Sequence, residues 1–286
     1  MRTTGTRRVL VTGASSGLGR TVALRLAAAG ARVVATVRSG ADAERLRETA
    51  LRQGITVNTV ILDLLDEPSV RAAAEFVSAR IGGLDALVNN AGVELAGPVE
   101  DASDDDVRWV LDTNVLGTVR LTRSALPLIR AGSDARILFV SSVVAFAARP
   151  FLSVYSASKY AVAGFAESLH WELAPDGIAV SLIEPGRFPT ALGANARGST
   201  GEHRQARRFA AALARLEPPG YAPDPGAVAD AVLAVLEHPA PPLHVPVGAD
   251  TEAVERLRAR SPFEPYAARM TALLDDETPA HPHERF

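Results

Sequence analysis

The chain has 286 residues, 47% of them hydrophobic, which predicts a folded protein with a large core rather than a disordered chain. A formal net charge of −3 argues against a basic surface for nucleic acid or an anionic membrane. The absence of cysteine excludes disulfides, thiolate metal sites and cysteine nucleophiles. No run of about 18 uncharged apolar residues occurs and no secretory segment opens the chain, so we expect a cytoplasmic protein that does not cross a membrane.

Short runs rich in Val and Ile alternate along the chain with longer stretches of helical spacing. In chain order, strands are expected at Val9–Thr12, Arg32–Val37, Thr56–Leu62, Ala86–Asn89, Arg136–Ser141, Ala179–Ile183 and His244–Val247. Helices are expected at about Gly17–Ala29, Ala41–Gln53, Pro68–Ile81, Ser103–Arg130, Ser153–Leu173 and Pro225–Glu237. The alternation predicts an α/β fold, with a single doubly wound Rossmann-type domain, a mostly parallel seven-stranded sheet and helices on both faces. Apolar runs such as Val57–Leu62 and Ile137–Val140 suit strands that are buried on both sides.

Two segments interrupt this alternation. Arg187–Asp224 shows no strand and has glycines and prolines around a basic helical piece, Glu202–Leu216. An insertion after the carboxyl end of a strand is typical of a substrate loop within the domain, which we place at residues 1–250. Residues 251–286 are expected to form a C-terminal helical extension and tail. The two histidines near its end, His281 and His283, indicate a frayed terminus rather than a metal site, so no metal is predicted.

A glycine-rich loop, Thr12-Gly13-Ala14-Ser15-Ser16-Gly17-Leu18-Gly19, lies between the first strand and the first helix. Glycines permit a tight turn and let backbone N–H groups approach a pyrophosphate, and the helix N-terminus adds its positive dipole end. Any tight turn between a strand and a helix can use glycine. The position directly after the first strand nevertheless favours nucleotide binding.

Four further motifs follow in a fixed order. They are Asn89-Asn90-Ala91-Gly92, then Asn114 in Asp112-Thr113-Asn114-Val115, then Ser142 thirteen residues before Tyr155-Ser156-Ala157-Ser158-Lys159, and finally Pro185-Gly186 with Thr190. Together with the TGxxxGxG loop, they resemble the short-chain dehydrogenase/reductase family. The YSASKYAVAGF run and the long C-terminal tail are similar to its 17β-hydroxysteroid dehydrogenase-like members. The resemblance covers roughly Arg8 to Gly248.

The resemblance assigns the catalytic roles to Asn114, Ser142, Tyr155 and Lys159. Tyr155 and Lys159 stand at i and i+4 on a predicted helix, so their side chains share one face. A phenol with an ordinary pKa of about 10 transfers protons poorly near neutrality, and a nearby ammonium stabilises the phenolate. The resemblance implies that Tyr155 is the general acid/base, that Ser142 binds the substrate oxygen, that Lys159 binds the ribose, and that Asn114 holds a relay water. Of the neighbouring serines, the spacing to Tyr155 favours Ser142 over Ser141.

The resemblance also implies a set of dinucleotide-binding residues. They are Gly13, Ser15, Ser16, Gly17, Leu18, Gly19, Arg38, Ser39, Asp63, Leu64, Asn90, Ala91, Gly92, Tyr155, Lys159, Pro185, Gly186, Phe188 and Thr190. NAD-preferring relatives end the second strand in an acidic residue, which would repel a 2′-phosphate. This chain has Val37 there, followed by Arg38 and Ser39, and a cation beside a hydroxyl suits a 2′-phosphate. We therefore expect NADP(H), with NAD(H) as the alternative, and Asp63 beside the adenine.

The expected substrate pocket is largely apolar. Its lining comprises Glu94, Val144, Phe146, Phe151 and Arg187, with Phe188 beside them. This lining favours a bulky hydrophobic small molecule with a carbonyl or alcohol group. The sequence therefore predicts an NADP(H)-dependent oxidoreductase that interconverts a ketone or aldehyde and an alcohol.

Two alternatives remain open. One is a redox-neutral epimerisation or elimination that uses the same cofactor. The other is a non-catalytic dinucleotide sensor, against which the complete catalytic set argues. Relatives pair the helices near Ser103–Arg130 and Ser153–Leu173 across a two-fold axis, so we expect a homodimer or homotetramer.

Overall fold

The computed structural model describes residues 6–188, 197–198, 208, 223–248 and 251. Its main sheet has seven strands in the order β3-β2-β1-β4-β6-β7-β9, and every neighbouring pair is parallel. The strands are β1 (Arg8–Val11), β2 (Arg32–Val37), β3 (Asn58–Ile61), β4 (Ala86–Asn89), β6 (Arg136–Val140), β7 (Ala179–Pro185) and β9 (His244–Val247). The larger helices are α1 (Gly17–Ala28), α2 (Gly40–Arg52), α3 (Glu67–Ile81), α4 (Asp104–Leu111), α5 (Thr118–Arg130), α6 (Ser153–Leu173) and α9 (Gly226–Glu237).

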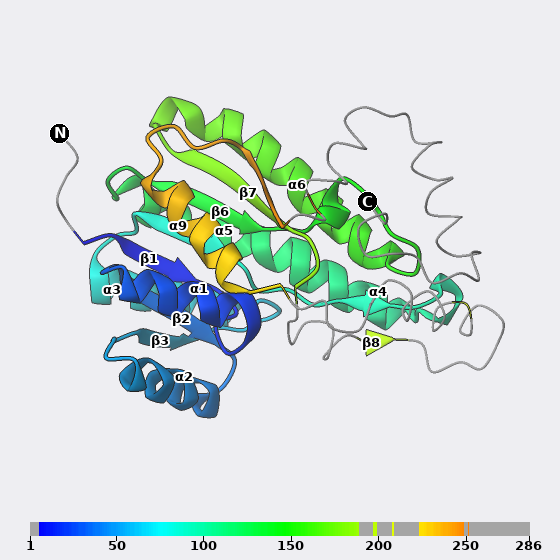
Figure 1. The fold of residues 1–286 in the computed structure, drawn as a ribbon, viewed down its shortest axis with the longest axis horizontal. Helices are drawn as coiled ribbons and strands as arrows, with labels where there is room; N and C mark the ends of the chain where they lie inside the picture. Colours follow the sequence, from blue (N-terminus) through cyan, green and yellow to red (C-terminus); the bar gives the residue numbers. More distant parts are fainter. Residues whose placement is uncertain (1–5, 189–196, 199–207, 209–222, 249–250, 252–286) are drawn as a thin grey trace.

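Helices cover both faces of this sheet, because successive strand residues point to opposite sides. In β1, Val9 and Val11 belong to a core that also contains residues of α1, α2 and α9, whereas Leu10 belongs to a core with α3, α5 and α6. Figure 1 shows α1 and α9 side by side on one face. The doubly wound Rossmann-type fold predicted from the sequence is confirmed. Within the described part of the chain, no helix is long and apolar enough to cross a membrane.

The order of the strands determines where a ligand can bind. From β1 the chain proceeds outward through β2 to β3, then returns to place β4 on the other side of β1. The connections after β1 and β4 therefore leave in opposite directions, and a crevice opens at the carboxyl ends of these two strands. The glycine-rich loop follows β1 and the Asn89–Gly92 segment follows β4, so both lie at this crevice.

Three expectations about individual elements are wrong. β3 is an edge strand, so residues 58–61 are only partly buried or exposed, and burial on both sides is confined to the flanking Val57 and Leu62. The helix expected at Ser103–Arg130 is divided by a π-helical segment, η2 (Asp112–Gly117). The insertion expected to lack strands contributes a two-residue strand, β8 (Arg197–Gly198), which pairs in parallel with β5 (Leu95–Ala96).

Each of these differences arises from a tertiary contact. β3 has a single neighbour, and β8 exists because a segment about a hundred residues away pairs with it. At Gly117 an added Cβ would lie 2.7 Å from the Leu64 Cβ, so η2 is packed tightly against the loop after β3. Of the helical piece predicted at Glu202–Leu216, only Arg208 is among the described residues. Of the C-terminal extension predicted at 251–286, only Thr251 is described.

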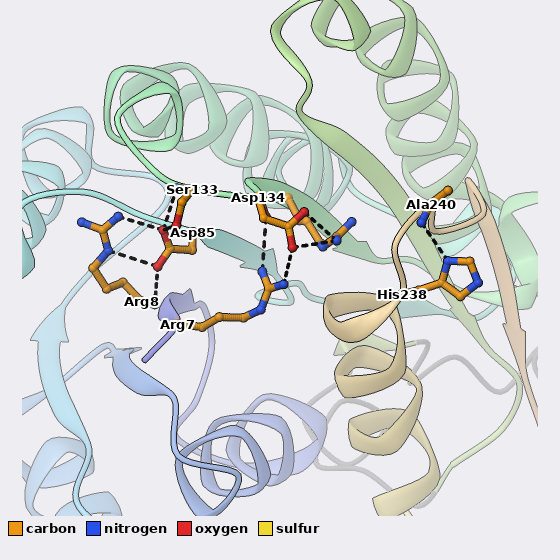
Figure 2. A network of polar contacts seen from close by, with 8 residues as sticks. Arg7, Arg8, Asp85, Ser133, Asp134, His238 and Ala240 are labelled. Atoms are coloured by element: carbon orange, nitrogen blue, oxygen red, sulfur yellow. Dashed lines mark hydrogen bonds and ion pairs between the residues drawn. The ribbon is translucent and has the colours of Figure 1, made fainter. Parts of the chain in front are cut away.

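A network of charged groups joins the amino ends of the central strands, at the edge opposite the crevice (Figure 2). Asp85, just before β4, accepts hydrogen bonds from the Arg8 backbone N–H (2.8 Å), from Arg8 Nη2 (2.7 Å) and from the Ser133 backbone N–H (2.9 Å). Burial alone would raise the pKa of Asp85. The hydrogen bonds from Arg8 and Ser133 outweigh burial and lower that pKa to about 2. Asp85 thus links β1, β4 and the turn before β6.

Candidate active site

An open cleft of about 290 Å³ occupies the crevice at the carboxyl ends of β1 and β4. Many of the residues that the sequence nominated line it: Gly13, Ser15, Ser16, Gly17, Leu18, Gly19, Arg38, Asp63, Leu64, Asn90, Ala91, Gly92, Glu94, Tyr155 and Lys159. The fold therefore brings the glycine-rich loop, the end of β2 and the start of α6 to one cavity.

The glycine-rich loop is fixed against the segment after β4. Gly13 has a φ of +67°, and an added Cβ there would lie 2.9 Å from the Ala91 Cα. A Cβ at Gly19 would lie 2.3 Å from both the Asn90 Nδ2 and the Gly13 carbonyl oxygen. The Thr12 hydroxyl accepts hydrogen bonds from the backbone N–H groups of Asn90 and Ala91, both at 2.9 Å. These contacts require glycine at both positions and fix the loop's main chain at the wall of the cleft.

Helix α1 begins at Gly17 and directs its N-terminus toward the cleft. Ser16 precedes it with extended backbone angles, and its side chain makes no capping hydrogen bond. Since a helix N-terminus has unsatisfied N–H groups and a positive dipole end, this arrangement suits an anion such as a pyrophosphate.

The positively charged side chain that was predicted after the second strand lies at the end of β2. Arg38 is exposed, lines the cleft, and is one of the groups that lower the pKa of Asp42, after the Ser39 and Arg45 contacts. Ser39 lies outside the cleft lining and caps α2. Its hydroxyl accepts from the Asp42 backbone N–H (3.1 Å) and donates to Asp42 Oδ2 (2.7 Å). Arg38 is thus the member of this pair that faces the cleft.

Tyr155 and Lys159 lie one helical turn apart on α6, and both are buried. Lys159 Nζ donates to the Val140 carbonyl oxygen at 3.1 Å and lies 5.7 Å from the centre of the Tyr155 ring. Burial raises the pKa of Tyr155 well above its ordinary value, as does the Glu94 charge, while a hydrogen bond with Ser142 acts in the opposite direction. Burial lowers the pKa of Lys159 to about 8, and Glu94 opposes that change. Near neutral pH the phenol is therefore protonated, and the amine is mostly charged.

The two neighbouring serines differ in their contacts. Ser142 shares a hydrogen bond with Tyr155, and its hydroxyl also accepts from the Val144 backbone N–H at 3.3 Å. Ser141 lines the cleft, but its buried hydroxyl has no hydrogen-bond partner among the described residues. The contact with Tyr155 supports the assignment of the catalytic role to Ser142.

Asn114 lies in the π-helical segment η2 and connects the loop after β4 to α6. Its Oδ1 accepts from the Val93 backbone N–H at 2.8 Å. Its Nδ2 donates to the Val93 carbonyl oxygen at 2.9 Å and to the Ser158 hydroxyl at 3.0 Å. The Ser158 hydroxyl in turn donates to the Tyr155 carbonyl oxygen at 2.7 Å. Both amide hydrogens of Asn114 are therefore used by protein groups, and the side chain positions Tyr155 through Ser158.

The predicted substrate residues differ in where they lie relative to Tyr155 and the cleft. Val144 is buried against Tyr155 in a small apolar cluster, and Phe146 packs on that cluster. Glu94 lines the cleft itself. Phe151 adopts a φ of 63°, and its carbonyl oxygen accepts from the Gly97 backbone N–H at 2.8 Å. Val144 and Phe146 thus form an apolar cluster with Tyr155, whereas Glu94 brings a carboxylate to the cleft. Val144, Phe146, Phe151 and Arg187 are not among the residues that line the cleft.

The residues after β7 lie at the same end of the sheet. Pro185 ends β7, and the Gly186 backbone N–H donates to the Val247 carbonyl oxygen at 3.0 Å. Phe188 is buried in the core that contains the α1 and α9 side chains, and the neighbouring Arg187 is half-buried. Thr190 lies outside the described residues.

Sequence reasoning did not identify every residue of the cleft. Additional lining residues are Thr36, Leu62, Leu65, Val93, Trp109, Thr113, Val140 and Ser141. Most of them lie within one or two positions of a motif. Their position at the end of a strand was therefore the sequence signal that could have identified them. Trp109 differs, because it reaches the cleft from α4 and has no motif next to it. A second cavity of about 310 Å³ is lined by residues that include Leu95, Pro98, Ser153 and Arg197.

Comparisons with known proteins agree with this architecture. A sequence model of the short chain dehydrogenase family matches residues 7–200. Human 17-beta-hydroxysteroid dehydrogenase type 1 is 42% identical over 200 residues, which are 68% of this chain and 60% of that protein. The chain spans 60–65% of the length of the first curated relatives that it matches. A short-chain dehydrogenase from Streptomyces avermitilis superposes with a TM-score of 0.80 at 30% identity, over 94% of this chain and 96% of that one.

Similar solved structures contain either dinucleotide. A short chain dehydrogenase from Burkholderia cenocepacia in complex with NADP has a TM-score of 0.70 at 30% identity, covering 88% of this chain and all of that one. The 3-ketoacyl-(acyl-carrier-protein) reductase from Brucella melitensis, complexed with NADH, has a TM-score of 0.71 at 28% identity, covering 84% of this chain and 96% of that one. Sequence match, fold and site geometry agree, and the chain belongs to the short-chain dehydrogenase family.

Proposed function

We propose that this protein is an NADP(H)-dependent oxidoreductase that interconverts a ketone or aldehyde and an alcohol on a mostly hydrophobic substrate. The observation that carries the proposal is the burial of Tyr155 beside Lys159, with Ser142 hydrogen-bonded to the phenol, in the cleft that the glycine-rich loop also lines. Family membership and the names of the relatives support the same reaction class.

The residues of the cleft fit a nicotinamide dinucleotide. The glycine-rich loop and the N-terminus of α1 would hold the pyrophosphate, since no Cβ can be accommodated at Gly13 or Gly19. A Cβ at Gly92 would make a tight but less severe contact, 3.2 Å from the Asn114 Oδ1. Lys159 would hold the ribose, and Arg38 would pair with a 2′-phosphate. When bound, the nicotinamide supplies or accepts the hydride.

Proton transfer is the task of Tyr155. In the reducing direction, its hydroxyl donates a proton to the substrate oxygen, which the Ser142 hydroxyl holds by a hydrogen bond. The phenolate left behind must then be stabilised in a buried site. Lowering the pKa of a phenol by about three units, toward neutrality, requires roughly 4 kcal/mol of stabilisation of the phenolate relative to the phenol. The Lys159 ammonium would supply part of this stabilisation, and the positive charge of a bound, oxidised nicotinamide would add to it.

The substrate side of the site favours apolar molecules. Val144 and Phe146 cluster against Tyr155, and Leu95, Pro98 and Val99 contribute apolar groups to the neighbouring cavity. The human relative is named for action on a hydroxysteroid. We therefore expect a bulky hydrophobic ketone or secondary alcohol. A redox-neutral epimerisation or elimination would use the same Tyr155, and unchanged nicotinamide absorbance during substrate turnover would distinguish it.

Cofactor preference is tested by titration with NADPH and, separately, with NADH, following nicotinamide fluorescence. Wild type should bind NADPH at least about tenfold more tightly than NADH, because Arg38 pairs with the 2′-phosphate. Arg38→Asp should reverse that order, since its carboxylate repels the phosphate. Arg20→Asp, an exposed arginine on α1, is the charge-matched control and should retain the wild-type order. A wild-type preference for NADH would contradict the cofactor assignment, and binding of neither would overturn the proposed function.

Catalysis is tested with NADPH and a panel of aryl, steroidal and long-chain ketones, comparing wild type with Tyr155→Phe. The variant should lose about two to four orders of magnitude in kcat/KM, because it keeps the ring but has no proton to donate. Its Kd for NADPH should stay within about twofold of wild type. Equal activity of the two proteins would contradict the role of the phenol.

A further inference from the structure

Arg197 contacts three parts of the protein, although no sequence motif marks it. Its backbone N–H donates to the Glu94 carbonyl oxygen at 3.1 Å, at the point where β8 pairs with β5. Its Nη1 lies 2.9 Å from Asp106 Oδ1, and its guanidinium carbon lies 4.1 Å from the centre of the Trp109 ring. Asp106 and Trp109 are three residues apart on α4, so one face of that helix receives the whole side chain.

Two of these partners belong to the wall of the catalytic cleft. Trp109 and Glu94 both line it, with Tyr155 and Lys159. The Glu94 charge also acts on both catalytic side chains, since it raises the pKa of each. Arg197 itself lines the neighbouring cavity, together with Leu95 and Ser153. Arg197 thus contacts both segments that bound this side of the cleft, the Glu94 segment through its backbone N–H and α4 through its side chain.

We propose that Arg197 is a positioning residue of the substrate site, which fixes the segment carrying Glu94 against α4 through the Asp106 ion pair and the stack on Trp109. The inference rests on the proposed function for its kinetic consequence. The contacts themselves are testable without any substrate.

The chemistry of the two side-chain contacts, with Asp106 and Trp109, requires arginine rather than any cation. The side chains of Arg197 and Asp106 are 50% and 27% exposed, and an ion pair at that exposure contributes little by charge alone. A planar guanidinium stacks on an indole face and presents its N–H donors sideways to a carboxylate at the same time. A lysine ammonium keeps the charge but does not form this planar arrangement. Arg197→Lys therefore separates the effect of geometry from that of charge.

The first test uses Trp109 as a fluorescent reporter. The chain has two tryptophans, and Trp171 is 74% exposed on α6, so Trp171→Phe leaves a protein whose tryptophan emission comes from Trp109 alone. In that background, Arg197→Ala should shift the emission to longer wavelength and raise acrylamide quenching about twofold, because the guanidinium no longer covers the ring. Arg197→Lys should give an intermediate value.

A matched control uses Arg130→Ala in the same background. Arg130 forms a 2.9 Å ion pair with Asp176 and is 53% exposed, but it lies at the end of α5, which is directed away from the cleft. Its removal should leave the emission and quenching unchanged. Identical emission in Arg197→Ala and its parent would show that the stack does not form in solution, which would overturn the proposal.

The second test is kinetic and uses the ketone of highest activity in the panel. Arg197→Ala should raise KM about tenfold while kcat and the Kd for NADPH stay within about twofold, because substrate contacts are altered and the cofactor cradle is not. Equal losses in kcat, KM and NADPH binding would indicate a general structural role and would contradict the proposal. If wild type reduces no ketone, the proposed function fails, and the fluorescence test still decides whether Arg197 holds Trp109.

Discussion

The two serine hydroxyl groups that follow β6 show how a single contact distinguishes residues of the same type. Ser141 and Ser142 are neighbours of the same type, yet only Ser142 shares a hydrogen bond with Tyr155. A hydroxyl near the phenol can hold the substrate oxygen and lower the cost of charge in the transition state. A buried hydroxyl without a partner among the described residues contributes no such stabilisation.

This difference leads to a prediction for a matched pair of variants. Ser142→Ala should lower kcat/KM for ketone reduction by about two orders of magnitude, since a hydrogen bond made in the transition state is lost. Ser141→Ala removes a hydroxyl of the same size one position earlier and should change kcat/KM by less than about threefold. Steady-state kinetics with NADPH in excess measures both. A larger effect in Ser141→Ala would show that the serine of the site is the earlier one.

At the scale of elements, the network around Asp85 contributes to the alignment of the central strands. The hydrogen bonds from Arg8 and Ser133 lower the pKa of Asp85 from 3.8 to about 2, which corresponds to about 2 kcal/mol of stability at neutral pH. Because the pKa is lower in the folded state, this contribution is complete above the unfolded value of 3.8. It is lost as pH falls through about 2.

Asp85→Asn should therefore reduce the free energy of unfolding by about 2 kcal/mol at pH 7. The difference in free energy of unfolding between the variant and wild type should narrow between pH 4 and pH 2, as Asp85 of the wild type becomes protonated. Urea unfolding at several pH values measures this difference. Asp230→Asn is the control, because Asp230 is 57% exposed and its ion pair with Arg25 should contribute less than about 1 kcal/mol. A gap that does not change with pH would contradict this account.

The division of the long helix by η2 is a second feature at this scale. An inserted residue changes the direction of side chains on one turn, and π-helical turns of this kind are frequent at functional sites. Here Asn114 is directed at the Val93 backbone and at Ser158, so the irregular turn connects the cleft to α6. Helical periodicity predicted a continuous helix, because one extra residue in 28 barely changes the pattern.

At the scale of the whole molecule, α4, η2 and α6 present large apolar side chains to solvent. Leu111, Leu116, Tyr160 and Trp171 are between 38% and 74% exposed, and α6 packs against both α4 and η2. Large apolar side chains exposed on neighbouring helices are a feature of association surfaces. These are also the helices that relatives are expected to pair across a two-fold axis.

We predict that the protein forms a homo-oligomer through this surface. Light scattering at micromolar concentration should give at least twice the 30.1 kDa of one chain. Trp171→Glu combined with Tyr160→Glu should reduce the mass toward that of one chain, because burying the new charges would be costly. Leu51→Glu is the control, since Leu51 is 77% exposed on α2, and it should leave the mass unchanged. A monomeric wild type would refute the prediction.

The sequence by itself determined the fold and most of the cleft. Buried parallel strands need continuous apolar runs, and turns that approach a dinucleotide need glycine at particular positions, so both are visible as local patterns. Gly13 and Gly19 were located in this way, and Tyr155 and Lys159 were located by their resemblance to the family motif. The cleft contains all four.

Only the tertiary structure decided the remaining features, because each depends on residues distant in the chain. β3 is partly exposed because it lies at the edge of the sheet, and β8 exists because it pairs with β5. The placement of Trp109 at the cleft, of Arg197 against Trp109 and of Phe188 in the core follows from packing between elements. The pKa values of Tyr155 and Lys159 follow from burial and from Glu94, which a linear sequence does not reveal.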